Sequence, residues 1–305
     1  MKIVNATQSF IWTPLANIYG RRPITLIAIL MTIIGSIGSA VSPSFGALVG
    51  MRAITGFGFG GMMSVGTAVV NDVFFLHERG EKTGVYVVFV TNGAHVAALA
   101  GGFLGQGANW QWDYWLGAAV TGVSFIVALF LFPETLFSRD PEFLAARSYE
   151  RSYSQMLFNI PGNRIPGRRL HAGDFLNSFY MLKYPSVSFT FWYYSWSWAF
   201  INVLPAITLA AIYSSEYKFK SGPIGACLGI PLIVGSVLGE MCSGRLSDYI
   251  MLRMAKRNNG VRKPEFRLYL STISAFFMPL GIIIFGACAG NTGFLPPLVG
   301  LSLGK

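Results

Sequence analysis

Residues 14–23, PLANIYGRRP, form a short polar and basic segment between two apolar stretches. Asn17, Gly20, Arg21 and Arg22 stand close together in this segment. Gly20 permits a tight turn, and Pro23 suits the first turn of a following helix. The stretch after it, Ile24–Val41, contains no charged residue. The segment is therefore expected to be a turn between two apolar helices.

The composition indicates lipid as the solvent for these apolar stretches. Hydrophobic residues make up 53% of the 305 residues and charged residues only 12%, whereas soluble domains carry about 25% charge. A helix needs about 20 apolar residues to cross a hydrocarbon core of about 30 Å. Seven windows approach or exceed that length with little or no charge: Ile24–Val41, Ala47–Val70, Val85–Leu104, Tyr114–Phe132, Val187–Tyr213, Ile224–Met241 and Leu268–Ala289. The predicted fold class is all-α, a polytopic membrane helix bundle.

Two shorter apolar pieces lie near the ends of the chain, Ile3–Ala16 and Phe294–Leu303. The first follows a single basic residue, Lys2, so a cleavable signal peptide is one alternative. That alternative requires a mature start inside the basic turn. We favour a partial span at each end of the chain. The prediction is therefore about seven complete transmembrane helices and two partial ones.

Nothing in the polar segments is typical of an enzyme. No Ser/His/Asp, Cys/His or paired-carboxylate arrangement occurs there, and the glycine run GFGFGG has no Lys-Ser or Lys-Thr after it. Cys227, Cys242 and Cys288 lie inside apolar windows at spacings that match no metal or redox motif. We therefore expect neither catalysis nor a cofactor or metal site.

The net charge of +10 is distributed by loop. Most lysines and arginines fall in alternate loops, around Arg21, Arg79, 139–183 and 245–267, whereas the intervening loops contain only Lys218 and Lys220. The positive-inside rule places the basic loops in the cytosol. Nucleic-acid binding would account for the net charge but not for this alternation, so no nucleic acid is expected as a partner.

The chain divides at one long polar segment. Residues 137–186 are rich in proline, glycine and arginine and are predicted to form a cytosolic central loop between helical halves 1–136 and 187–305. The halves contain a weak repeat, since TPLANIYGRR in the first has a counterpart, GRLSDYIMLRMAKR, in the second. Internal repeats around a midplane binding site are typical of secondary transporters.

The motifs resemble those of the major facilitator superfamily. Leu15, Ala16, Gly20, Arg21 and Arg22 fit its helix 2 to helix 3 loop, G-x-L-a-D-r-x-G-r-R, with Thr13 for the first glycine and Asn17 for the aspartate. The second copy keeps Gly244, Leu246 and Asp248 but lacks the following Gly-Arg-Arg.

Other motifs narrow the resemblance to the fungal twelve-span drug:proton antiporter-like branch. RAITGFGFG is similar to its helix 4 motif, which opens with the membrane-embedded Arg52, and WQWDYW and PETL resemble segments flanking helix 6. Gly84, Gly93, Gly101 and Gly102 keep the register of its helix 5 motif, but Ala97 and Ala98 replace the Gly-Pro pair. The resemblance implies that the chain runs from the end of helix 2 to the start of helix 10 and lacks parts at both ends.

Residues expected to act in coupling and gating are Arg52, Asp72, Asn17, Arg21, Arg22, Glu240 and Asp248. A charge at Arg52 costs about 2.5–3.5 kcal/mol on insertion scales, so it needs a partner or a water-filled cavity, or it snorkels outward. Asp72 is too far along the same helix to pair with Arg52 and is expected to face Arg21 and Arg22. Glu240 is either a protonation site or anchored by a loop arginine such as Arg245.

Candidates for a substrate cavity are Asn92, His95, Trp196, Trp198 and Asn202. His95 lies near the middle of an apolar window with Asn92 one turn before it, and a polar contact inside the bundle is the alternative. The tryptophans follow Trp192, Tyr193 and Tyr194, which suit an interfacial aromatic belt. Deeper aromatic rings are able to hold a flat or cationic solute.

The sequence thus favours a secondary active transporter for a small organic or cationic solute. It is expected to be proton-coupled, monomeric and in the plasma membrane, related to multidrug or polyamine-like efflux, with the direction of transport left open. The alternative is a non-transporting membrane protein or an inactive truncated product, and this chain alone is expected to be inactive. A transporter of this family has an inner gate, the contacts that close its cytosolic side. Because Asn17 replaces an aspartate and an amide can only hydrogen-bond, we expect this gate to depend more on Asp72 and Asp248.

Overall fold

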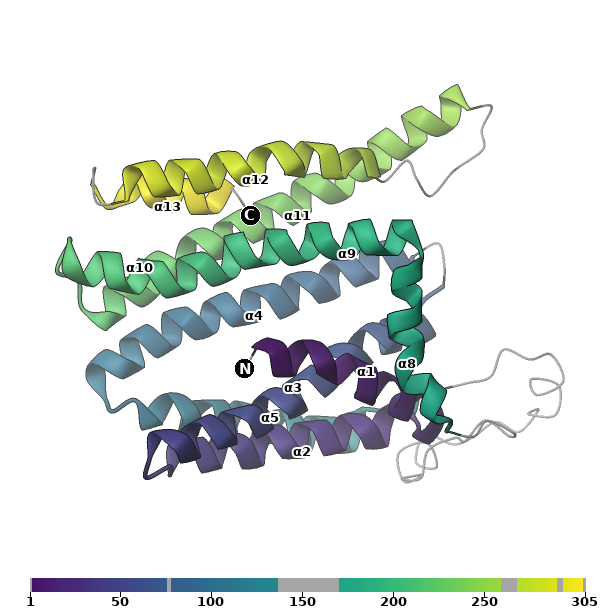
Figure 1. The fold of residues 1–305 in the computed structure, drawn as a ribbon, viewed down its shortest axis with the longest axis horizontal. Helices are drawn as coiled ribbons and strands as arrows, with labels where there is room; N and C mark the ends of the chain where they lie inside the picture. The colour runs from purple at the N-terminus through teal and green to yellow at the C-terminus, as the bar shows by residue number, and fades with distance from the viewer. Residues whose placement is uncertain (1, 76–77, 137–169, 259–267, 290–292, 304–305) are drawn as a thin grey trace, which may run out of the picture. The chain divides into compact units, whose positions relative to one another are not determined.

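A computed structural model describes residues 2–75, 78–136, 170–258, 268–289 and 293–303, apart from the side chains of some helical residues. These residues form helices, and no strand occurs among them (Figure 1). They group into two compact units, one of Met1–Arg79 with Trp110–Pro185 and one of Gly80–Asn109 with Ser186–Lys305. Each unit is described on its own. The division into 1–136, 137–186 and 187–305 follows the chain rather than packing and stays a prediction.

The first unit contains α1 (Lys2–Tyr19), α2 (Arg21–Ala40), α3 (Phe45–Val73), α5 (Gln111–Leu131) and α8 (Ala172–Tyr180), followed by the 3₁₀ turn η1 (Met181–Lys183). α2 packs against both α3 and α5, and α1 packs against α3. The core between α1, α2 and α3 is a buried cluster of Trp12, Ala16, Ile24, Ala28 and Val65. The Trp12 indole nitrogen donates to the Phe57 carbonyl at 2.9 Å.

Small residues bring α2 and α3 together closely. A methyl group at Gly58 would lie 2.5 Å from the Ala28 carbonyl oxygen, and one at Gly35 would lie 2.5 Å from the Thr55 hydroxyl oxygen. Small residues have this role in membranes because apolar side chains gain little by leaving lipid, so close van der Waals contact drives association. The opposite side of α2 exposes Ile27, Leu30, Ile34 and Ile37, as expected for a face toward acyl chains.

The second unit contains α4 (Arg79–Gly107), α9 (Pro185–Trp198), the π-helical turn η2 (Ala199–Val203), α10 (Leu204–Ser215), α11 (Ser221–Arg257), α12 (Leu268–Cys288) and α13 (Leu295–Leu303). Its core contains Leu209, Tyr213, Leu232, Phe285 and Leu301. The Tyr213 hydroxyl donates to the Phe294 carbonyl at 2.7 Å, which satisfies its polar end.

Helix α4 packs along α11 through glycines. The Cα atoms of Gly102 and Gly225 face each other so closely that a methyl group at either would lie 2.8 Å from the other. A methyl group at Gly229 would lie 2.8 Å from the His95 carbonyl oxygen. Polar groups extend the same seam toward the start of α11, where the Gly222 amide donates to the Gln106 side chain at 2.9 Å.

The described helices match the predicted windows. Six are long and apolar enough to cross a membrane: Arg21–Ala40, Phe45–Val73, Glu81–Gly107, Gln111–Leu131, Val187–Ser215 and Ser221–Met241. The seventh window lies on α12. The apolar stretch of this helix within the described residues is Ala275–Cys288, which is shorter than a full span. The two partial pieces lie on α1 and α13. The prediction of an all-α, multi-pass membrane bundle is therefore confirmed.

Candidate functional site

The basic turn in residues 14–23 separates α1 from α2. Its backbone depends on Gly20, which has φ 111° and ψ 157°, a region that residues with a Cβ rarely enter. Because α1 ends at Tyr19 and α2 begins at Arg21, this single residue reverses the chain between them. The turn thereby places two arginines at the N-terminal end of α2, where their cationic side chains need partners from other elements.

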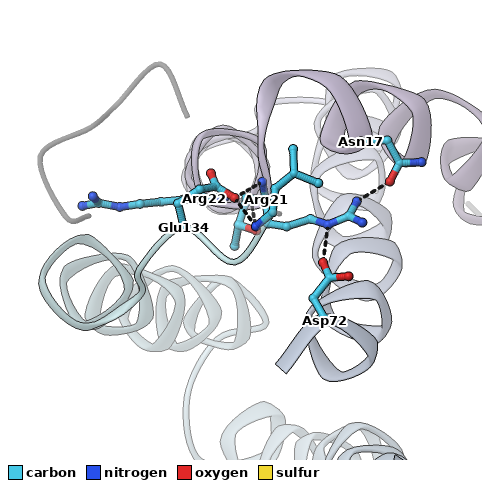
Figure 2. A network of polar contacts seen from close by, with 7 residues as sticks. Asn17, Arg21, Arg22, Asp72 and Glu134 are labelled. Atoms are coloured by element: carbon cyan, nitrogen blue, oxygen red, sulfur yellow. Dashed lines mark hydrogen bonds and ion pairs between the residues drawn. The ribbon is translucent and has the colours of Figure 1, made fainter. Parts of the chain in front are cut away.

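Arg21 is the centre of a polar network, which we call the Arg21 cluster: Asn17, Arg21, Arg22, Asp72 and Glu134 (Figure 2). The Arg21 Nε donates to Asp72 Oδ2 at 3.0 Å in an ion pair, and its Nη1 donates to Asn17 Oδ1 at 2.6 Å. The arginine is 7% exposed. One guanidinium therefore links the last turn of α1 to the last turn of α3, in the pairing that the sequence favours for Asp72.

Glu134 completes the cluster from a distant part of the chain. Its carboxylate accepts from the backbone amides of Arg21 at 2.8 Å and Arg22 at 3.2 Å, and also from Leu136 at 2.9 Å. A carboxylate at this place satisfies first-turn N–H groups of α2 and is stabilised by the helix dipole. Sequence reasoning missed this role, because it used PETL only as a family motif and the two partners are 113 residues apart.

The Arg22 side chain donates a hydrogen bond to the C-terminal end of another helix, α5. Its Nη2 donates to the carbonyl oxygen of Leu129 at 2.7 Å, in the last turn of α5. A cation there satisfies a carbonyl without an intrahelical partner and matches the negative end of the helix dipole. Arg22 is 3% exposed, so this contact is shielded from solvent. The basic turn thus binds α5 twice, through Arg22 and through Glu134 just beyond that helix.

The cluster balances two arginines with two carboxylates in a buried site. Removing one partner of a buried ion pair leaves an uncompensated charge, which costs about 3–5 kcal/mol. The arrangement therefore tends to be either fully formed or separated, and it joins α1, α2, α3 and the segment after α5 at one end of the first unit. Chemically it is a lock between helices rather than a site for bond making.

Arg52 contacts an aromatic ring. Its guanidinium carbon lies 5.4 Å from the centre of the Tyr114 ring, so α3 and the first turns of α5 meet through a cation–π contact. The residue is half-buried. The sequence predicted a partner, a water-filled cavity or an outward-reaching side chain for this charge, and it did not identify the aromatic ring. Its expected coupling role stays a prediction.

Three predicted residues of the second unit lie at different heights on α4 and α11, which pack against each other. Asn92 donates to the Val88 carbonyl at 3.0 Å and accepts from the Ser236 hydroxyl at 2.7 Å, so its amide joins the two helices. His95 is 6% exposed, one turn further along α4. Glu240 on α11 faces Gly84, where a methyl group would lie 2.6 Å from Glu240 Oε1. The structure thus brings Asn92, His95 and Glu240 to one helix pair.

The remaining candidates lie outside that helix pair or outside the described side chains. Trp196 is 57% exposed and stacks on Phe200, with ring centres 5.6 Å apart, while Trp198 stacks on Tyr194. Asn202 lies within the π-helical turn. Asp248 belongs to α11 by its backbone, but its side chain lies outside the described residues. The searched part of the chain contains no group of three His, Cys, Asp or Glu side chains able to hold a metal.

Comparison with known proteins gives a consistent result. The family model of the Major Facilitator Superfamily matches residues 3–304. The MFS transporter cpaT of Aspergillus oryzae is 30% identical over 293 residues, which cover 94% of this chain and 58% of that protein. The efflux pump radE of Floropilus chiversii is 26% identical over 283 residues, 92% of this chain and 52% of that protein. The chain therefore spans a little over half the length of these relatives.

A solved structure shares the fold. The xylose transporter XylE from E. coli, in a partially occluded inward-open conformation, matches with a TM-score of 0.60 and 16% sequence identity. The match covers 99% of this chain and 68% of that one. At this identity the likeness concerns the arrangement of helices and not the solute.

Proposed function

Because the chain belongs to the major facilitator superfamily, we propose that the protein containing it is a secondary active transporter for a small organic or cationic solute. Transport proceeds by alternating access between two helical halves and is coupled to protons. The transporter is a monomer in the plasma membrane, and residues 137–186 face the cytosol. The relatives named efflux pumps, radE among them, favour export as the direction.

The observation that carries this proposal is the Arg21 cluster. A buried ion pair that joins the ends of α1 and α3, next to a carboxylate that caps α2, holds these helix ends in one arrangement. Alternating access between two halves needs the helices of each half to move together, and the cluster holds these helix ends of the first half in one arrangement. We assign Arg21, Arg22, Asp72 and Asn17 to the inner gate on this basis, with Asp248 as the second-half counterpart of Asn17 in the repeat.

Coupling to protons is assigned to Arg52 and Glu240. Both are charged side chains within the windows predicted to cross the membrane, where ionisable residues commonly mark ion pathways. Asn92, His95, Trp196, Trp198 and Asn202 are proposed to contact the solute. An amide, an imidazole and aromatic rings suit a flat or cationic organic molecule, since each offers hydrogen bonds or a π face.

The experiment uses the protein as its own gene encodes it, purified and reconstituted in liposomes with an imposed pH gradient. A panel of cationic and neutral organic compounds is tested for saturable, gradient-dependent flux. The Arg52→Ala variant should lose the dependence on the gradient, whereas Lys82→Ala, at an exposed pair with Glu81, should retain it. Gradient-driven flux that is unchanged in Arg52→Ala would refute the coupling role.

The same assay separates transport from the alternative class of function. Saturable flux of any compound excludes a non-transporting membrane protein. The unfolding midpoint shows whether the reconstituted protein is folded. If folded protein transports no compound of the panel, the result favours a sensor or an inactive product instead.

A further inference from the structure

Helix α8 is a short amphipathic helix that the proposed transport function does not use. Phe179 stacks on Phe10 of α1 with ring centres 4.1 Å apart and planes inclined by 15°. This contact fixes one side of α8 to the first unit. Leu176 and Tyr180 on the same helix are nevertheless strongly exposed, so their surroundings need an explanation.

A stripe of exposed side chains follows α8 and η1 at helical spacing. Leu176 and Tyr180 are each 65% exposed and lie one turn apart on α8, and Tyr184, directly after η1, is 54% exposed. The Lys183 ammonium lies 5.6 Å from the centre of the Tyr180 ring. Asp174 lies on the opposite side of the helical wheel from Leu176. We call Leu176, Tyr180, Lys183 and Tyr184 the α8 stripe.

The position of the α8 stripe along the chain restricts what can cover it. The membrane-length segment Val187–Ser215 begins three residues after Tyr184. Three extended residues reach about 10 Å, so the end of the stripe lies within that distance of the span. A helix so close to the hydrocarbon edge meets the headgroup layer, where tyrosine rings and lysine side chains are both favourable.

We propose that the α8 stripe lies in the membrane interface and is covered by phospholipid. Leu176 enters the upper acyl region, Tyr180 and Tyr184 lie at the level of the headgroups, and Lys183 extends to their phosphates. An interfacial helix of this kind inserts its apolar face by about 5–10 Å. Because Phe179 is stacked on Phe10, α8 also links the partial span of α1 to the headgroup layer. A soluble partner protein is the competing occupant, and the following experiment distinguishes it.

The test places one fluorescent bimane label on each side of α8. Cys227, Cys242 and Cys288 are first replaced by alanine in the protein as its own gene encodes it, and Leu176→Cys and Asp174→Cys are then made separately. Each labelled protein is placed in phosphatidylcholine–phosphatidylserine nanodiscs. Quenching is measured with a nitroxide on the upper acyl chain and with aqueous iodide. Unfolding midpoints check that both variants are folded.

The proposal predicts that the acyl-chain nitroxide quenches the Leu176→Cys label at least about twofold more strongly than the Asp174→Cys label. Iodide should show the opposite order. Equal quenching of the two labels by iodide would overturn the proposal, because the stripe would then face water. Protection of the Leu176→Cys label from both quenchers would also overturn it, since protein would then cover the stripe.

Discussion

Replacing Glu134 by alanine tests whether the distant carboxylate holds the basic turn together. In the variant, the amides of Arg21, Arg22 and Leu136 all lose their acceptor at once. Glu134 is 6% exposed, so water replaces the carboxylate only in part. We therefore expect a larger loss of stability than a substitution on the surface causes.

The magnitude follows from the contacts. Loss of an N-terminal helix cap costs about 0.5–2 kcal/mol. Hydrogen bonds to a charged group contribute about 1.5–3 kcal/mol. These contributions overlap, so we expect a total of about 2–4 kcal/mol for Glu134→Ala. At about 2–4 °C per kcal/mol, the unfolding midpoint should fall by about 4–16 °C. Glu134→Gln keeps one acceptor oxygen and should lose roughly half as much.

The measurement is thermal unfolding of the protein as its own gene encodes it, followed by tryptophan fluorescence in one detergent. The control is Glu81→Ala, because Glu81 is also an acid with a basic partner, Lys82 at 2.9 Å, but its side chain is 73% exposed. Exposed pairs contribute about 0–1 kcal/mol, so this midpoint should hardly change. If Glu134→Ala lowers the midpoint no more than Glu81→Ala does, the carboxylate does not stabilise the turn as we infer.

Further predictions concern the gate, the helix seam and one strained loop residue. Asn17→Asp adds an anion beside the Arg21 guanidinium, which should strengthen the Arg21 cluster by about 1 kcal/mol and slow opening of the inner gate about fivefold. An unchanged rate of flux in a stopped-flow experiment would contradict this. Gly225→Ala puts a methyl group 2.7 Å from the Ala98 carbonyl and should destabilise by about 1–3 kcal/mol. Gly93→Ala, on the facing helix α4 with open space around it, should be neutral or stabilising, so equal losses in thermal unfolding would disprove the role of the seam. Lys218 has φ 55°, and Lys218→Gly should raise stability by about 0.5–1 kcal/mol; a lowered midpoint would show that the backbone is not strained there.

Several features of the site were accessible from the sequence because they are local or carry strong constraints. An uncharged window can cross lipid only as a helix, since every backbone N–H and C=O must be satisfied within the segment. Gly20 followed by two arginines marked a turn that cannot lie in the hydrocarbon. The pairing of Asp72 with the turn could be expected, because the length of its helix separates it from Arg52 and brings it to the level of Arg21.

Other features depend on contacts that no local pattern encodes. Glu134 follows a different helix, and its contact with α2 exists only because α5 packs against α2. Arg52 was expected to need a partner or a water-filled cavity, or to snorkel outward, and the tertiary structure supplies the ring of Tyr114 as its partner. Asn92 was considered as a cavity residue, but its amide bonds to Ser236 across the seam. In each case the partner is selected by how the helices cross.

The sequence by itself determined the solvent, the class of fold, the helices and the basic turn, because hydropathy and backbone hydrogen bonding act over neighbouring residues. Only the tertiary structure decided which groups meet at that turn: a guanidinium shared by Asn17 and Asp72, a carboxylate from beyond α5 at the start of α2, and an arginine at the end of α5. The physical reason is that charges buried at helix ends are stable only with partners, and helix packing decides which partners are within reach.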